Sequence, residues 1–324
     1  MFNTLWPIII AGLMNGSFVV PSKYISGLNN DEIWFYHSII GLIILPWLML
    51  SMIAPEAFNA YTTLPHTLLL VILLIGAIFG GGQICFMTAI KRIGIGASFA
   101  VNLGMGTIIG SLFVVFYKKM LLTQHGFFVI LAVLLVITSL WLYYLAIKPI
   151  KDGRASSSKV YLASCLGWVF AILAGIASGL QNILFTTIFF AQIPSMKSLN
   201  PFWIWPPFLL GAAIPMAISL YHQARRSALL THSINLRLEQ RNIILIALMG
   251  ICFTGSLVLY STTMAHLNSQ VQLFAWPAFM VAIILSAQFW GYLEIKQKSL
   301  PHKTNYIACS ILILITAIVF LSYP

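Results

Sequence analysis

Apolar stretches of membrane length follow one another along almost the whole chain. A helix needs about 20 residues to cross a hydrocarbon core of ~30 Å. Hydrophobic residues make up 60% of the chain and charged residues 7%, so the apolar side chains cannot all be hidden inside a water-soluble globule. We therefore predict an all-α integral membrane protein. Its expected spans are Leu5 to Tyr24, Ile33 to Met52, Leu68 to Ile90, Ala97 to Tyr117, Gly126 to Leu145, Tyr161 to Phe190, Phe202 to Tyr221, Ile243 to His266, Val271 to Tyr292 and Asn305 to Ser322.

Two stretches of the first half resemble two stretches of the second. GAIFGGGQICFMTAI, which begins at Gly76, matches GICFTGSLVLYSTTM, which begins at Gly250. AGLMNG, which begins at Ala11, resembles AGIASG, which begins at Ala174, and it precedes the longer match in each half. Two matches in the same order predict internal duplication. The longer match pairs Gly76 with Gly250, Phe79 with Phe253, Gly81 with Gly255 and Thr88 with Thr262.

A polar connection separates the halves. The segment from Lys148 to Lys159 reads KPIKDGRASSSK and is rich in Gly and Ser. It divides the chain into a first repeat, residues 1–147, a linker, residues 148–159, and a second repeat, residues 160–324. Because each repeat has five helices, an odd number, the second must start on the opposite side of the membrane. The prediction is ten transmembrane helices as two inverted five-helix repeats, an arrangement typical of secondary transporters.

Basic residues are concentrated in the connections on one of the two sides of the membrane that this helix count implies. One side carries fourteen of the 17 Lys and Arg residues and the other side carries three. Connections rich in Lys and Arg face the cytoplasm, so we expect an inner-membrane protein with the linker inside and both termini outside. The same bias explains the net charge of +11 without a nucleic-acid partner. The sparse side has Lys118, Lys119 and Lys197.

Several prolines lie within the predicted spans. Proline lacks an N–H, so it leaves a carbonyl without a donor and kinks the helix. Such breaks are tolerated where protein or a wet cavity covers them. We therefore expect a hinge or a cavity wall at Pro46, Pro206, Pro207, Pro215 and Pro277.

Amide side chains within the spans are few. Because lipid offers no hydrogen bonds, each must face another helix or a wet cavity. Amides can pair with sugar hydroxyls, and aromatic rings can cover an apolar sugar face. The alternative is that each amide only bridges two helices. The predicted substrate-binding residues are Asn15, Gln83, Asn102, Gln181, Asn182 and Gln272, with Tyr260 and Trp276 as aromatic walls.

One of these amides belongs to a stripe of small residues. Ser98, Asn102, Gly106 and Gly110 recur every four residues and share one face of the fourth span. Small residues let helix backbones approach closely. We expect this face to serve helix packing more than ligand contact.

Enzyme chemistry has little support. The chain has no GxSxG, HExxH or phosphate-binding loop, and its six acidic residues lie at or beyond span ends. The four cysteines lie in apolar stretches without CxxC spacing, so we expect no metal site and no cofactor. The acids are Asp31, Glu32, Glu56, Asp152, Glu239 and Glu294.

Several short motifs together resemble the drug/metabolite transporter superfamily and, within it, the bacterial L-rhamnose–proton symporter family. They are DEIWFYHSIIG from Asp31, ILPW from Ile44, GAIFGGGQICF from Gly76, RIGIGAS from Arg92 and MAH from Met264. The resemblance implies two inverted five-helix repeats and sugar uptake with protons. It also implies a carboxylate just inside the ninth helix, where this chain has Gln272 in QVQLFAW. The resemblance therefore does not carry over the substrate or the proton coupling.

The sequence predicts a secondary transporter of a small polar metabolite, for instance a sugar such as L-rhamnose, by alternating access. The alternatives are an exporter of amino acids or amphiphilic compounds and a non-transporting sensor or scaffold. Its partners would be a small-molecule substrate and the lipid bilayer, with protons and a homodimer left open. We expect facilitative or weakly proton-coupled transport, with any coupling through His37 and with Glu294 as second choice, because imidazole and carboxylate are the groups that titrate in membranes.

Overall fold

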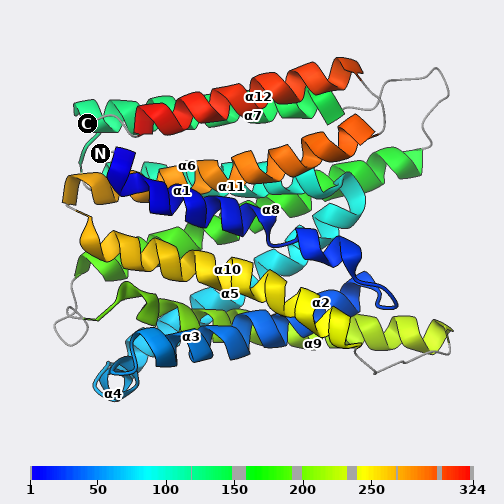
Figure 1. Ribbon diagram of the computed structural model, residues 1–324, viewed down its shortest axis with the longest axis horizontal. Coiled ribbons are helices and arrows are strands. Elements are labelled where there is room, and N and C mark those ends of the chain that lie inside the picture. The colour runs from blue at the N-terminus through cyan, green and yellow to red at the C-terminus, as the bar shows by residue number, and fades with distance from the viewer. Residues whose placement is uncertain are drawn as a thin grey trace. The chain divides into compact units, whose positions relative to one another are not determined.

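The computed structural model describes residues 2–117, 119–147, 158–191, 199–231, 239–267, 269–297 and 301–321. Every regular element in these ranges is helical (Figure 1). Lipid offers no hydrogen bonds, and a helix satisfies its backbone N–H and C=O groups within its own segment. The elements are α1 (Phe2–Ser17), η1 (Val20–Tyr24), α2 (Asn30–Ile39), the π-helix η2 (Ile40–Ile44), α3 (Leu45–Ile53), α4 (Ala57–Tyr61), α5 (His66–Ile93), α6 (Ile95–Tyr117), α7 (Gln124–Ile147), α8 (Ser158–Ala191), η4 (Pro201–Ile204), α9 (Trp205–Thr231), α10 (Gln240–His266), α11 (Ser269–Gln297) and α12 (Pro301–Leu321).

Nine segments of the described chain are long and apolar enough to cross a membrane. They coincide with the first nine predicted spans. The last predicted span, from Asn305, falls on α12, whose apolar part Asn305–Ala317 is shorter than the others. The protein is therefore a multi-pass membrane protein, while the tenth span remains a prediction. Most of the linker predicted at 148–159 lies outside the described residues.

The chain forms two compact units, and each unit draws on both halves of the sequence. The first unit contains residues 1–16, 82–183 and 267–324, and the second contains residues 17–81 and 184–266. Helices α5 and α8 contribute one part to each unit.

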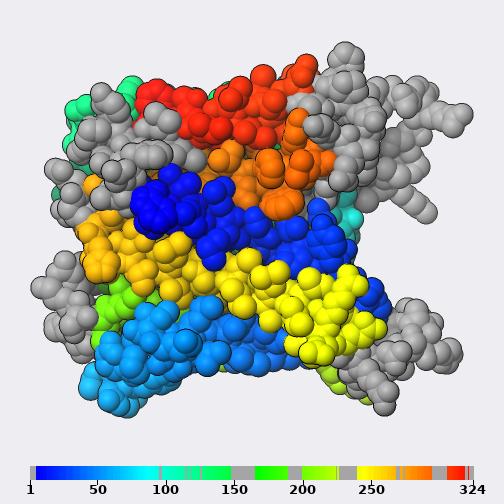
Figure 2. Space-filling view, in the orientation of Figure 1, coloured from blue at the N-terminus to red at the C-terminus, as the bar shows by residue number. Residues whose placement is uncertain are grey.

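Within the first unit, α7 packs against α12 and α6 against α11 (Figure 1). Figure 2 shows α12 and α11, in red and orange, side by side. Apolar residues fill the space where α6, α7 and α12 meet: Ala100, Tyr143, Ala146 and Ile307 are all buried. These three helices thus share one core.

A closed hydrogen-bond network joins α7, α11 and α12. The Gln288 amide nitrogen donates to the Ser139 hydroxyl at 3.3 Å, and the Ser310 hydroxyl donates to the Gln288 amide oxygen at 2.8 Å. The two serine oxygens lie 2.7 Å apart. All three side chains are fully buried, so this network ties the helices together.

Within the second unit, α2 packs against α9, and α5 packs against α9 through glycines. A Cβ added at Gly76 would meet the Phe208 carbonyl, and one at Gly80 would meet the Ala212 carbonyl. Only glycine allows the backbones to approach so closely. In α4, outside the candidate spans, Tyr61 donates to the Trp203 carbonyl at 2.6 Å, and burial raises the pKa of its hydroxyl.

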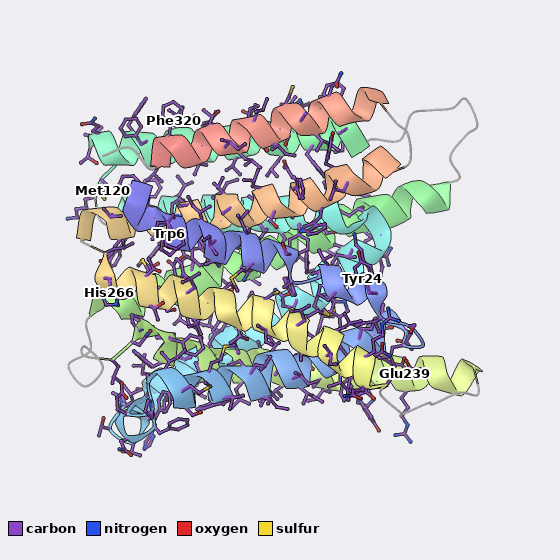
Figure 3. The ribbon with its side chains drawn as sticks, in the orientation of Figure 1. Trp6, Tyr24, Met120, Glu239, His266 and Phe320 are labelled. Atoms are coloured by element: carbon purple, nitrogen blue, oxygen red, sulfur yellow. The ribbon has the colours of Figure 1, made fainter. Side chains whose placement is uncertain are left out.

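Hydrogen bonds tie the start of α10 to the last residue of η1 and to the segment that follows it. Arg241 donates to the Tyr24 carbonyl at 3.3 Å, and Asn242 donates to the Ser26 carbonyl at 2.8 Å. Figure 3 labels Tyr24 and also Glu239 and His266, which mark the two ends of α10.

The prolines fall in two kinds of position. Pro215 and Pro277 lie inside α9 and α11, as predicted. Pro206 and Pro207 instead occupy the first turn of α9, where no helical donor is lost, so the kink expected there is wrong. Pro46 follows the π-helix η2.

Candidate functional site

The small-residue face of α6 packs against α8 and α11. The Ser178 hydroxyl on α8 donates to the Asn102 amide oxygen at 3.0 Å. One turn on, a Cβ at Gly106 would lie 3.1 Å from the Met280 terminal methyl and 3.2 Å from the Ser178 Cβ. The predicted packing role of this face agrees with these contacts, and Asn102 is hydrogen-bonded within it.

A second amide and an indole meet the same face one turn further along. A Cβ at Gly110 would fall against the Asn182 amide nitrogen and would lie 2.8 Å from the Trp276 indole nitrogen. Asn182 is fully buried and Trp276 is 4% exposed. The missing Cβ therefore leaves room for two N–H donors, from α8 and α11, to converge on α6.

Asn15, Gln83 and Gln181 also belong to the first unit. Asn15 is buried. In sequence it lies between Gly12 and Gly16, both of which pack closely against α11. Gln83 is half-buried and follows Gly82, which packs against α8. Gln181 is buried next to Asn182.

Gln272 lies in the first turn of α11, one turn before Trp276. Its amide nitrogen donates to the Leu267 carbonyl at 2.9 Å. The side chain is half-buried. Gln272 therefore bonds locally to the start of its own segment.

Tyr260 lies in the second unit, within an aromatic cluster. Its ring is 5.6 Å from the Phe185 ring, which stacks on Trp205 at 5.0 Å. The Trp205 indole donates to the Ser261 hydroxyl at 2.7 Å. All three rings are almost fully buried.

His37 is buried in the second unit, on the last turn of α2. The rings of Phe18, Trp34 and Phe253 lie between 5.5 and 6.3 Å from its imidazole. Its Nδ1 has no hydrogen-bond partner among the described residues. The side chain is 2% exposed, so its surroundings within this unit are apolar.

Among the side chains whose burial the structure describes, no Asp, Glu, Lys or Arg is buried. His37 is the buried histidine of that set. The side chain of Glu294, the second coupling candidate, lies outside the described set.

Two residues important to these arrangements are absent from the predicted site. Ser178 aligns with Asn15 in the shorter repeat match, which was a usable signal. Thr254, which donates to the Gly41 carbonyl at 2.9 Å, lies inside the longer match, but nothing in its sequence context distinguishes it from threonines bonded within their own helix.

Comparison with known proteins finds relatives along most of the chain. It is 21% identical over 297 residues to the L-rhamnose-proton symporter of Shigella dysenteriae serotype 1 (strain Sd197), covering 87% of this chain and 86% of the relative. The symporter of Escherichia coli (strain 55989 / EAEC) is 21% identical over 296 residues, with the same coverage. The family model for L-rhamnose-proton symport protein (RhaT) matches residues 1–323. The chain therefore belongs to the L-rhamnose-proton symport protein family, a family of proton-coupled transporters and not of enzymes.

Proposed function

We propose that the protein is a secondary transporter that carries L-rhamnose, or another neutral sugar of that size, together with protons across the bacterial inner membrane. The observation that carries this proposal is the family match along residues 1–323. The absence of a buried carboxylate, lysine or arginine among the described side chains also favours a neutral solute. Family membership shifts our expectation from facilitative or weakly coupled transport to proton symport.

Inverted repeats are typical of transporters that work by alternating access, and the glycines of the shorter repeat match support such a relation between the two halves. Gly12 and Gly16 of α1 pack against α11, the fourth span of the second half. Gly175 and Gly179 of α8 pack against α6, the fourth span of the first half. The first span of each half thus packs on the fourth span of the other, as two-fold pseudosymmetry demands.

The longer repeat match behaves in the same way. Gly76 of α5 packs against Phe208 of α9, which is the second span of the other half. Gly250 of α10 packs against Gly41 and Leu45, in the second span of the first half. Equivalent spans also pair directly, because α2 packs on α9, α6 on α11 and α7 on α12.

The proposed sugar site is formed by the amides and the indole of the first unit. Asn182 and Trp276 supply N–H donors next to Gly110, and Asn102 lies two turns earlier on the same face. Sugar hydroxyls can accept from these donors and donate to amide oxygens. Asn15, Gln83, Gln181 and Gln272, of the same unit, remain proposed contributors to this site. Tyr260 remains a proposed substrate contact of the second unit.

The proposed proton site is His37. A coupling residue must titrate inside the membrane, and His37 is the buried histidine among the described side chains. The three aromatic rings around it do not titrate near neutral pH. Glu294 stays the second choice.

Counterflow in proteoliposomes tests the substrate. Vesicles loaded with unlabelled L-rhamnose should take up labelled L-rhamnose faster than vesicles loaded with an amino acid or a nucleoside. Protein-free vesicles give the leak. Counterflow with amino acids but not with sugars would replace the sugar proposal by the exporter alternative.

A further inference from the structure

The break between α2 and α3 leaves the Gly41 carbonyl without a donor in either the α or the π pattern. In the π-helix η2, the Leu45 N–H donates to the Ile40 carbonyl, five residues back. In an α-helix that N–H would have served Gly41. The next candidate in the π pattern is Pro46, which has no N–H. The Gly41 carbonyl therefore needs a donor from outside its own helix.

Thr254 of α10 supplies that donor. Its hydroxyl donates to the Gly41 carbonyl at 2.9 Å, and its side chain is fully buried. Two facing glycines allow this approach, because a Cβ at Gly250 would lie 2.8 Å from the Gly41 Cα. A buried carbonyl that lost this bond would be costly, since no water replaces the donor.

The same turn supports His37. A Cβ at Gly41 would lie 2.6 Å from the imidazole Cε1 and 2.8 Å from Nδ1. The imidazole therefore rests on the bare backbone of Gly41, whose carbonyl Thr254 holds. Any change in this turn moves the surface on which His37 lies.

The aligned position in the other half carries no hydroxyl. At the offset that pairs Gly76 with Gly250, Thr254 pairs with Gly80. A Cβ at Gly80 would fall on the Ala212 carbonyl, so the corresponding contact in the other half is backbone packing without a side chain. Of the two aligned positions, only Thr254, which contacts the π-helix next to His37, carries a hydroxyl.

We propose that Thr254 is a positioning residue for proton coupling. Its hydroxyl makes the π turn at Ile40–Ile44 a stable arrangement, and the turn holds His37. In α-helical register the Leu45 N–H would instead serve the Gly41 carbonyl, which would then no longer need the Thr254 hydroxyl. Helical π-turns often occur at functional sites. The link to coupling rests on the proposed role of His37.

The first test replaces the hydroxyl with a methyl group of similar size. In T254V, sugar uptake driven by an imposed proton gradient should fall by about tenfold, as expected when a buried carbonyl loses its donor. T254S, which keeps the hydroxyl, should stay within about threefold of the parent protein. T263V is the matched control, because Thr263 on the same helix donates to its own helix, to the Leu259 carbonyl at 2.7 Å.

The second test restores a main-chain donor. P46A adds an N–H that can serve the Gly41 carbonyl in the π register or the Leu42 carbonyl in the α register. The T254V/P46A double variant should therefore recover uptake to within about threefold of the parent. If T254V does not purify as a folded protein, the double variant should. Failure of P46A to rescue either uptake or folding would overturn the proposal.

Hydrogen–deuterium exchange separates this proposal from the proposed function. T254V should raise exchange in residues 38–46 and leave α12 unchanged, and P46A should reverse the effect. Unchanged exchange, or equal losses of uptake in T254V and T263V, would refute the role of Thr254 while leaving the transporter assignment intact. Proton-driven uptake that survives His37→Gln, with the exchange result as expected, would instead refute His37 as the coupling residue and keep the π turn.

Discussion

At the scale of single residues, we propose different roles for two buried amides of similar chemistry. Gln288 is enclosed by Ser139 and Ser310, which satisfy both ends of its amide. The amide nitrogen of Asn182 and the indole nitrogen of Trp276 instead both pack against Gly110. A closed network stabilises the fold, whereas converging donors suit a ligand.

Replacing each amide by leucine should separate these roles. Gln288→Leu should lower the free energy of unfolding by about 1–3 kcal/mol, because two buried hydroxyls lose partners. Asn182→Leu should reduce L-rhamnose counterflow at least tenfold with a smaller change in melting temperature. Melting curves of the detergent-purified variants and counterflow check both. If Asn182→Leu lowers only the melting temperature, Asn182 is a structural bridge.

His37 provides the second prediction at this scale. His37→Gln keeps a polar side chain of similar size but removes titration. Proton-driven accumulation should be lost, while counterflow, which needs no proton gradient, should stay within about threefold of the parent protein, since binding is unchanged. An intact accumulation ratio would move the coupling role to Glu294.

At the scale of helices, adjacent glycines on α5 face different surroundings. A Cβ at Gly80 would fall on the Ala212 backbone, which cannot move without shifting α9. A Cβ at Gly81 would meet nothing within 4 Å. We expect Gly80→Ala to destabilise the protein by about 1–3 kcal/mol through overpacking. Gly81→Ala is the matched control and should be neutral or stabilising by up to about 1 kcal/mol, because alanine favours helix. Equal melting temperatures would contradict the close packing of α5 on α9.

At the scale of the whole molecule, the predicted orientation follows from the unequal Lys and Arg content of alternate connections. An alkaline phosphatase fused after Pro324 should be active, because the enzyme folds outside the cytoplasm. The same enzyme inserted between Lys148 and Lys159 should be silent, and a fluorescent protein there should fluoresce. The opposite pattern would mean that the helix count or the orientation is wrong.

The sequence by itself determined the membrane class, the position of nine spans and the family resemblance. Lipid makes these properties local, since each helix must satisfy its own backbone and cover itself with apolar side chains. The small-residue stripe with Gly106 and Gly110 also indicated a closely packed face on the fourth span. Tertiary structure decided which polar groups meet. Ser178 bonds Asn102, and Asn182 converges with Trp276, because helices distant in sequence bring them together. Thr254 was hidden for the same reason. Its hydroxyl matters only because Pro46 and the π-helix, on a different helical segment, leave the Gly41 carbonyl without a main-chain donor.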